Sequence, residues 1–154
     1  MENAFRLKKL TVEILGVSCQ YETETKDGDG TVYNAVLQKK DSRIPHFALR
    51  NLFEVGLAKV VATICHLNNE GFKLSTIVPT TIKLSGKDDA IGISIAGHFI
   101  YGLTKIQFKT SKIKYKAADN DFCADLTVLV EEITAEIKKY LFEGATESVE
   151  IFGE

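Results

Sequence analysis

Five lysines and no carboxylate lie in the stretch KIQFKTSKIKYK, which runs from residue 105 to residue 116. Lysine ammonium groups attract phosphate, and aromatic rings stack on bases of any sequence. A cationic strand with interleaved aromatic residues is therefore typical of proteins that bind single-stranded DNA or RNA without reading its sequence. The residues that we predict to contact phosphate are Lys105, Lys109, Lys112, Lys114 and Lys116. Tyr101 or Tyr115 is predicted to stack on a base.

The same lysines have a second interpretation that needs no ligand. If the stretch is a strand, Lys112, Lys114 and Lys116 project to one side and the residues between them project to the other. Lysines on the outer side of an edge strand prevent edge-to-edge aggregation. They can also pair with the strongly acidic segment 117–154 that follows. The sequence leaves open whether these lysines meet phosphate or the protein's own carboxylates.

The three histidines do not form a metal-binding pattern. His46 and His66 are twenty residues apart, which is about 30 Å along a helix, so they cannot share an ion within one unbroken helix. His98 is distant from both in the sequence. The acidic run at 27–30 lacks the later ligands of a calcium loop, and its glycines instead predict a hairpin turn. We therefore predict neither a metal nor a cofactor.

The chain also lacks a recognisable nucleophile. Cys19, Cys65 and Cys123 are widely spaced and include no C-x-x-C pair, which favours reduced thiols in a cytoplasmic compartment. Cys65 and Cys123 stand in apolar stretches, where a free cysteine behaves as a small hydrophobic residue. Asp88 and Asp89 fall in a predicted turn, where aspartate is favoured for its backbone hydrogen bonds. With no phosphate-binding glycine loop either, we predict that the protein is not an enzyme.

Length and composition are those of one domain. The 154 residues are 45% hydrophobic and 26% charged with a net charge of -2, which suits a single domain over 1–154. No apolar run approaches the length of a membrane span, and the first residues lack the apolar core of a secretory signal. We expect a cytoplasmic protein that does not enter a membrane. Residues 145–154 form an acidic tail that either frays or adds a strand.

Hydrophobic periodicity predicts the elements that position the lysine stretch. Strand patterns fill the first forty residues, with a hairpin about the Asp-Gly turn, and they return between two helical patterns. The helices are predicted at about 45–67 and 121–143, and the first of them is expected to be capped by Asp41 or Ser42. The order is β-β-β-α-β-β-β-α, which predicts an α+β fold with a mostly antiparallel sheet.

The first predicted helix is apolar on more than one side. Such a helix needs cover from a second direction, either from the other helix or from another subunit. Val55, Leu57 and Val61 spread away from the main apolar stripe, and we predict that they form the interface of a homo-oligomer. Gly56 lies inside this helix at a cost of about 1 kcal/mol relative to alanine. It is therefore expected to permit a close approach of another backbone.

Four segments between residues 44 and 144 follow one another in a recognisable order. They are IPHFALRNL at a helix start, the hairpin IVPTTIKLSGKDDAIGISIAG, the lysine-rich strand, and the helix end EEITAEIKKYLFEG. This arrangement resembles a family of small uncharacterised proteins encoded by bacteriophages and prophages. Members tend to be encoded near phage replication and recombination functions, so the resemblance implies a phage accessory protein with a role related to nucleic acid. It implies no activity and no site residue.

Three functions remain open at this point. The first is a non-enzymatic, phage-type protein that binds single-stranded DNA or RNA during replication or recombination. The second is a homo-oligomeric structural or interaction protein. The third is a sponge or inhibitor that binds a small signalling molecule or a host protein.

Overall fold

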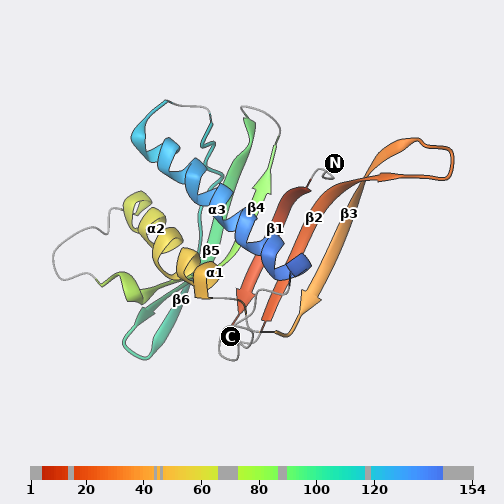
Figure 1. Ribbon diagram of the computed structural model, residues 1–154. Coiled ribbons are helices and arrows are strands. Elements are labelled where there is room, and N and C mark those ends of the chain that lie inside the picture. The colour runs from red at the N-terminus through yellow and green to blue at the C-terminus, as the bar shows by residue number, and fades with distance from the viewer. Residues whose placement is uncertain are drawn as a thin grey trace.

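The computed structural model describes residues 5–13, 16–43, 45, 47–65, 73–86, 90–116 and 119–143. In this part of the chain six strands form one antiparallel sheet in the order β3-β2-β1-β4-β5-β6 (Figure 1). The strands are β1 (Phe5–Glu13), β2 (Gly16–Lys26), β3 (Val32–Asp41), β4 (Ile77–Ser85), β5 (Gly92–Tyr101) and β6 (Thr104–Lys109). One helical segment follows β3 and another follows β6. The predicted α+β class and element order are confirmed.

Both helical segments lie against the same face of the sheet, which gives the described part of the chain two layers (Figure 1). Alternate residues of each strand point to that inner face. Leu10, Ile82 and Ile95 are fully buried there. Ladder pairing sets these three side chains in one row across the central strands, because Leu10 lies opposite Ile82 and Ile82 lies opposite Ile95. The outer face carries no helix among the residues that the structure describes.

The segment after β3 is a helix with a π-helical middle. α1 (Phe47–Asn51) and α2 (Ala58–Ile64) flank the π-helical turns of η1 (Leu52–Leu57). A Cβ atom added to Gly56 would lie 2.7 Å from Cδ1 of Leu129 in the C-terminal helix. The nearest atoms at Gly56 therefore belong to a side chain of that helix and not to a backbone, which differs from the close backbone approach expected there. The first predicted helix is confirmed.

The C-terminal helix, α3 (Asp121–Glu143), confirms the second predicted helix. Its first turn is capped by Asn120, whose Oδ1 accepts a 2.9 Å hydrogen bond from the backbone N–H of Cys123. Ile133 and Ile137 are fully buried against the sheet. The helix therefore covers the inner face along most of its length.

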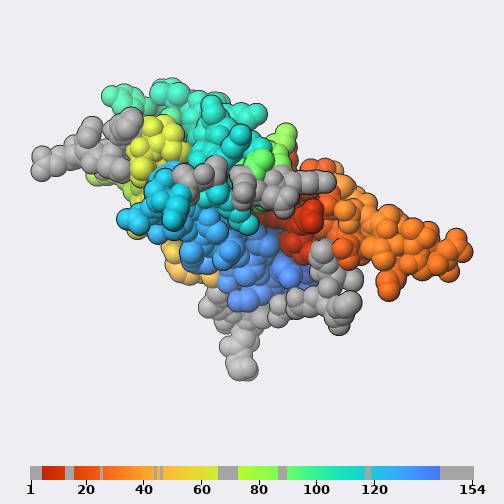
Figure 2. Space-filling view, turned by 90° about the horizontal axis from the view of Figure 1, so that it is seen from above, coloured from red at the N-terminus to blue at the C-terminus, as the bar shows by residue number. Residues whose placement is uncertain are grey.

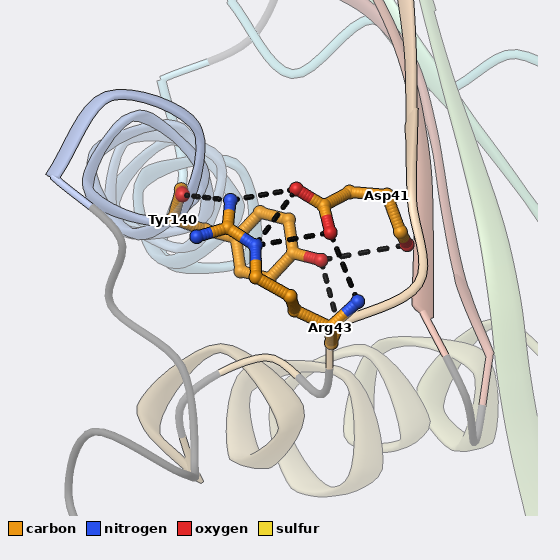
Figure 3. A network of polar contacts seen from close by, with 3 residues as sticks. All are labelled: Asp41, Arg43 and Tyr140. Carbon is orange, nitrogen blue, oxygen red and sulfur yellow. Dashed lines mark hydrogen bonds and ion pairs between the residues drawn. The ribbon is translucent and has the colours of Figure 1, made fainter.

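A polar network joins the end of β3 to α3 (Figure 3). Arg43 donates from Nε and Nη2 to the carboxylate of Asp41 at 2.6–3.0 Å. The fully buried Tyr140 donates from its hydroxyl to the backbone carbonyl of Arg43 at 2.6 Å. The prediction that Asp41 or Ser42 caps the first helix is wrong, because Asp41 ends a strand and α1 begins only at Phe47.

The β2–β3 hairpin extends beyond the rest of the sheet, at one end of an elongated molecule (Figures 1 and 2). Ten residue pairs join β2 to β3, whereas β1 pairs with β2 only as far as Thr23. At the tip, Oδ1 of Asp27 accepts hydrogen bonds from the N–H groups of Asp29 and Thr31, at 2.9 and 3.0 Å. The Asp-Gly run thus forms the predicted turn, and β3 is the outermost strand on this side.

Candidate nucleic-acid interface

The lysines of β6 lie on the outer, helix-free face of the sheet. Lys105 is paired with Ile100, and Lys109 is paired with Ala96. Ile100 and Ala96 alternate with the buried Ile93 and Ile95 on β5 and therefore point outward. Directly opposed residues in an antiparallel pair share a face. Lys105 and Lys109 consequently project outward and are exposed.

A one-residue bulge brings the next two lysines onto the same face. Lys109 pairs with Ala96, and the following bridge joins Ile113 to Ile93. The four residue steps from Lys109 to Ile113 therefore lie opposite only three steps, from Ala96 to Ile93, on β5. The extra step is accommodated at Thr110, whose N–H donates to the Ile95 carbonyl at 2.8 Å and whose hydroxyl accepts from the Ile95 N–H at 2.9 Å. A bulge of this kind shifts the alternation of side chains by one residue. Ile113 therefore points inward.

Because Ile113 points inward, Lys112 and Lys114 on either side of it point outward. A Cβ atom added to Gly92 would lie 2.8 Å from both Cγ and Cε of Lys112, and one added to Gly86 would lie 2.8 Å from its Nζ. The Lys112 stem thus lies flat on the sheet across two glycines. Because these glycines have no side chains, the stem can lie over them, and the ammonium group of Lys112 reaches the end of β4.

Lys83 of β4 belongs to the same surface, which the sequence analysis did not detect. It is exposed, and it alternates with the buried Ile82 and Leu84. We use the term lysine face for the outward-pointing set Lys83, Lys105, Lys109, Lys112 and Lys114. The period-two pattern of β4 could have revealed Lys83, but only once β4 was known to be a neighbour of β5.

The lysine face is not neutralised by carboxylates of the described residues. The described part of segment 73–116 contains seven lysines and no aspartate or glutamate. Within the residues that the structure describes, no ion pair includes a lysine of this face; the pairs found there include Arg6–Glu22 at 3.6 Å and Lys139–Glu136 at 3.4 Å. The acidic helix α3 packs on the opposite face of the sheet (Figure 1). The described carboxylates of α3 therefore leave these ammonium groups unpaired.

The two tyrosines and Lys116 do not join the lysine face. Tyr115 is only 4% exposed and packs in the core, where burial raises its pKa, so its ring cannot stack on a base. Tyr101 is 78% exposed, but it shares the inward alternation of Ile93 and Ile95 and lies at the end of β5. Lys116 follows the buried Tyr115 and lies beside α3. The prediction of Tyr115 as a stacking residue is wrong, because a strand that covers the core buries its inward aromatic residues.

The oligomer interface predicted on the first helix is also largely buried inside the protein. Leu57 and Val61 are fully buried in the core, and only Val55, at 37%, is exposed. The prediction is wrong for Leu57 and Val61 because α3 and the sheet cover the first helix from two sides. Exposed apolar side chains gather instead on β3, where they are Val32, Tyr33, Val36 and Leu37.

The described residues contain no cluster of three or more His, Cys, Asp or Glu side chains that could hold a metal ion. Cys19 is buried, which raises the pKa of its thiol to about 12, and Cys123 is buried as well. Cys65 is exposed, contrary to the expectation that it lies in apolar surroundings. The remaining predicted features, His46, His66, Asp88, Asp89 and the tail 145–154, lie outside the described residues.

None of the described helices is long and apolar enough to cross a lipid bilayer. Comparison of the chain with protein-family models, with curated proteins and with solved structures gives no match.

Proposed function

We propose that the lysine face binds the phosphate backbone of nucleic acid without reading its sequence. The observation that carries the proposal is the convergence of five lysines on one surface, where the described residues supply neither an ion pair for them nor a covering helix. Two of the five are brought there by the bulge at Thr110. Phosphate contacts of this kind supply most of the affinity of non-specific binding. The proposed role is non-enzymatic and needs no cofactor. The resemblance to phage-encoded proteins fits such a role, which would be exercised in the host cytoplasm.

The dimensions of the lysine face suit a short run of backbone. Lys105 and Lys109 are separated by about 13 Å along β6, and β4 and β6 are separated by about 10 Å across β5. The outward neighbours on β5 are Ser94, Ala96, His98 and Ile100. His98 is the one aromatic side chain among these four, so stacking contributes little and we expect affinity to depend chiefly on charge. The proposal favours single-stranded DNA or RNA because a flexible strand can follow a twisted sheet.

The test is a titration of labelled oligothymidylate, followed by fluorescence anisotropy between about 50 and 200 mM salt. The logarithm of the binding constant should fall linearly with the logarithm of salt concentration. The triple variant Lys105→Gln, Lys109→Gln and Lys112→Gln removes three cations and should reduce the slope by about 2, at about 0.7 per phosphate of a single strand. The control variant carries Lys59→Gln and Lys139→Gln, which remove exposed cations from the helical layer.

Two outcomes would contradict the proposal. One is the absence of binding at the lowest salt concentration. The other is an equal loss of affinity per removed charge in the triple variant and in the control variant. The second outcome would mean that only the overall charge matters and that the lysine face has no special part.

A second candidate function, self-association, is favoured by the free edge of β3. This strand runs without a bulge for ten residue pairs against β2, and its other edge has no neighbour among the described residues. Charged residues, glycine and proline on an edge strand normally block its pairing with another strand. The run from Val32 to Gln38 contains none of them. Four exposed apolar residues lie on it. We infer that β3 is the surface through which a homo-oligomer would form.

A two-fold axis at Ala35 gives a self-complementary arrangement. Tyr33 would face Leu37 of the second copy on the inner side, and Asn34 would face Val36 on the outer side. Because opposed residues of an antiparallel pair share a face, both pairs match in position, and the pair of Tyr33 with Leu37 is also apolar on both sides. Such a symmetric contact is closed and makes a dimer of two sheets joined edge to edge.

Light scattering at increasing protein concentration tests this second candidate. We expect a dimer for the natural sequence and a monomer for Val36→Lys, because a lysine on an edge strand opposes pairing with the edge of another sheet. Val128→Lys is the matched control, since Val128 is 51% exposed on α3 and lies away from β3. A natural protein that stays monomeric at the highest concentration would rule out this candidate.

A further inference from the structure

A groove opens where β1 and β4 separate. These strands pair over only three residues, from Lys9 to Thr11 on β1 and from Lys83 to Thr81 on β4. Beyond this short ladder the start of β1 and the end of β4 diverge, and α3 crosses the gap on the inner side. The space has a volume of about 350 Å³ and continues along α3 into a second hollow of about 330 Å³. The splayed strands thus leave a continuous opening beside the helix.

Tyr115 presents an unpaired hydroxyl to this groove. The residue is 4% exposed and lines both hollows. Its hydroxyl forms no hydrogen bond within the described part of the chain, although every fully enclosed polar side-chain atom there has a partner. The hydroxyl therefore touches the open space of the groove. Burial, together with the negative charge of Glu131, raises the pKa of Tyr115, so the hydroxyl keeps its proton at neutral pH and can donate.

The charged side chains around the groove are mostly cationic. Arg6, Lys8, Lys116 and Lys138 line it, and Glu131 is the one carboxylate among the described lining residues. The salt bridges of Arg6 and Lys8 to Glu22 are long, at 3.6 and 3.9 Å, and lie on the outer side of the sheet. Lys116 and Lys138 have no ion pair within the described residues. An anion in the groove would therefore find partners that the protein itself does not occupy.

The walls between these cations are apolar and suit a flat ring. Phe5, Leu7, Leu84, Ile91 and Val130 line the first hollow. The Nζ of Lys138 lies over the Phe5 ring, 5.7 Å from its centroid, and the Phe5 ring is stacked on Tyr21 with 4.9 Å between the two centroids. Sites for small molecules combine such apolar walls with a few polar groups and have volumes from about 300 Å³ upward. The groove has the size for one ring system joined to one anionic group.

We propose that this groove binds a small molecule in which a phosphate is joined to a flat ring, the chemistry of a mononucleotide. The phosphate accepts hydrogen bonds from the Tyr115 hydroxyl and from Lys116 and Lys138. The ring lies against the apolar wall formed by Leu84, Ile91 and Val130. Among the described residues none of the five lysines of the lysine face lines the groove, although the Lys112 ammonium lies beside Gly86 at its edge. The proposal for the groove does not depend on whether the lysine face binds nucleic acid.

Isothermal titration with adenosine, guanosine, cytidine and uridine 5′-monophosphates, each beside its nucleoside, tests the site. We expect at least one monophosphate to bind about tenfold more tightly than its nucleoside, since a hydrogen bond to a charged group contributes on that order. Tyr115→Phe keeps the ring and removes only the hydroxyl, so it should weaken that binding about tenfold without altering the circular dichroism spectrum. Lys138→Gln should weaken it, whereas Lys139→Gln, on the neighbouring position of α3, should not.

The proposal is overturned if no monophosphate binds more tightly than its nucleoside. It is also overturned if binding occurs but Tyr115→Phe and Lys138→Gln leave it unchanged. Competition distinguishes a free nucleotide from the end of a strand, and it is measured in a variant that carries Lys105→Gln and Lys109→Gln and keeps Lys112. Displacement by a 5′-phosphorylated oligothymidylate, but not by its hydroxyl-terminated form, would identify a strand end as the source of the phosphate. Displacement by neither would identify a free nucleotide.

Discussion

The hydroxyl of Tyr140 donates a 2.6 Å hydrogen bond to the backbone carbonyl of Arg43, which fastens the end of α3 to the segment that leaves β3 (Figure 3). Tyr140 is fully buried, and burial raises the pKa of its hydroxyl to about 12. The hydroxyl therefore keeps its proton and can donate at neutral pH. The guanidinium of Arg43 also lies over the Tyr140 ring, 5.2 Å from its centroid.

Replacing Tyr140 by phenylalanine should destabilise the fold by about 1 kcal/mol, because it leaves the part-buried carbonyl of Arg43 without this donor. The free energy of unfolding, measured with urea, gives the size of the effect. Tyr33→Phe is the control, since Tyr33 is 48% exposed and lies on β3 away from the network. Equal stabilities of Tyr140→Phe and the natural protein would show that the bond contributes nothing.

Acid should weaken the same network through Asp41. Hydrogen bonds from Arg43 lower the pKa of this carboxyl from 3.8 to about 2. A lowered pKa means that the stabilising contribution is complete above about pH 4 and is lost as the pH falls toward 2. Asp41→Asn should therefore be less stable than the natural protein at neutral pH, with the difference shrinking below pH 4. Urea unfolding across this range measures it, and Asp125→Asn is the control, since it removes an exposed carboxylate of α3 outside the network.

Gly92→Ala should disturb the lysine face without removing any charge. The new methyl group would lie 2.7 Å from the Ile113 carbonyl oxygen and 2.8 Å from the Lys112 stem. We expect a loss of about 1–3 kcal/mol in stability and weaker binding of oligothymidylate at low salt. Gly28→Ala is the matched control, since nothing lies within 4 Å of a Cβ atom at that turn position. Unchanged binding by Gly92→Ala would mean that the placement of Lys112 is unimportant.

The three cysteines should differ sharply in reactivity. Cys65 is exposed, whereas Cys19 and Cys123 are buried and the pKa of Cys19 is raised to about 12. A thiol reagent should therefore modify Cys65 in the native protein and the other two only after unfolding in urea. Cys65→Ser should abolish the native reaction. Rapid modification of that variant would contradict the buried positions of Cys19 and Cys123.

The periodicity of the sequence was sufficient to predict the order of strands and helices. The strands of the central sheet alternate clearly, as in the isoleucines of β5, and α3 has one continuous apolar stripe. The lysines of the stretch were correctly expected on the solvent side, because on a half-buried strand a charged side chain is stable only on the face that is exposed to water.

Sequence reasoning failed where the outcome depends on non-local packing. Tyr115 and Val61 are apolar enough for either an interface or a core, and only the assembled layers decide that both are core. Lys83 lies more than twenty residues from Lys105, so its membership of the lysine face follows from the order of strands and not from local pattern. The bulge at Thr110 contains no glycine that would have predicted it from the sequence. It is stabilised by the Thr110 hydroxyl, which accepts the hydrogen bond of the Ile95 N–H in place of a backbone carbonyl.

That bulge has a consequence for how the protein can change through evolution. If a substitution at Thr110 removed the bulge without removing a residue, simple alternation would continue after Lys109, and Ile113 and Tyr115 would then share an odd-numbered frame with the lysines of β6. The two hydrophobic side chains would turn to water and Lys112 and Lys114 would turn to the core. The cationic surface is therefore encoded as a reading frame in space, and a substitution that changes no charge would remove two of its five lysines.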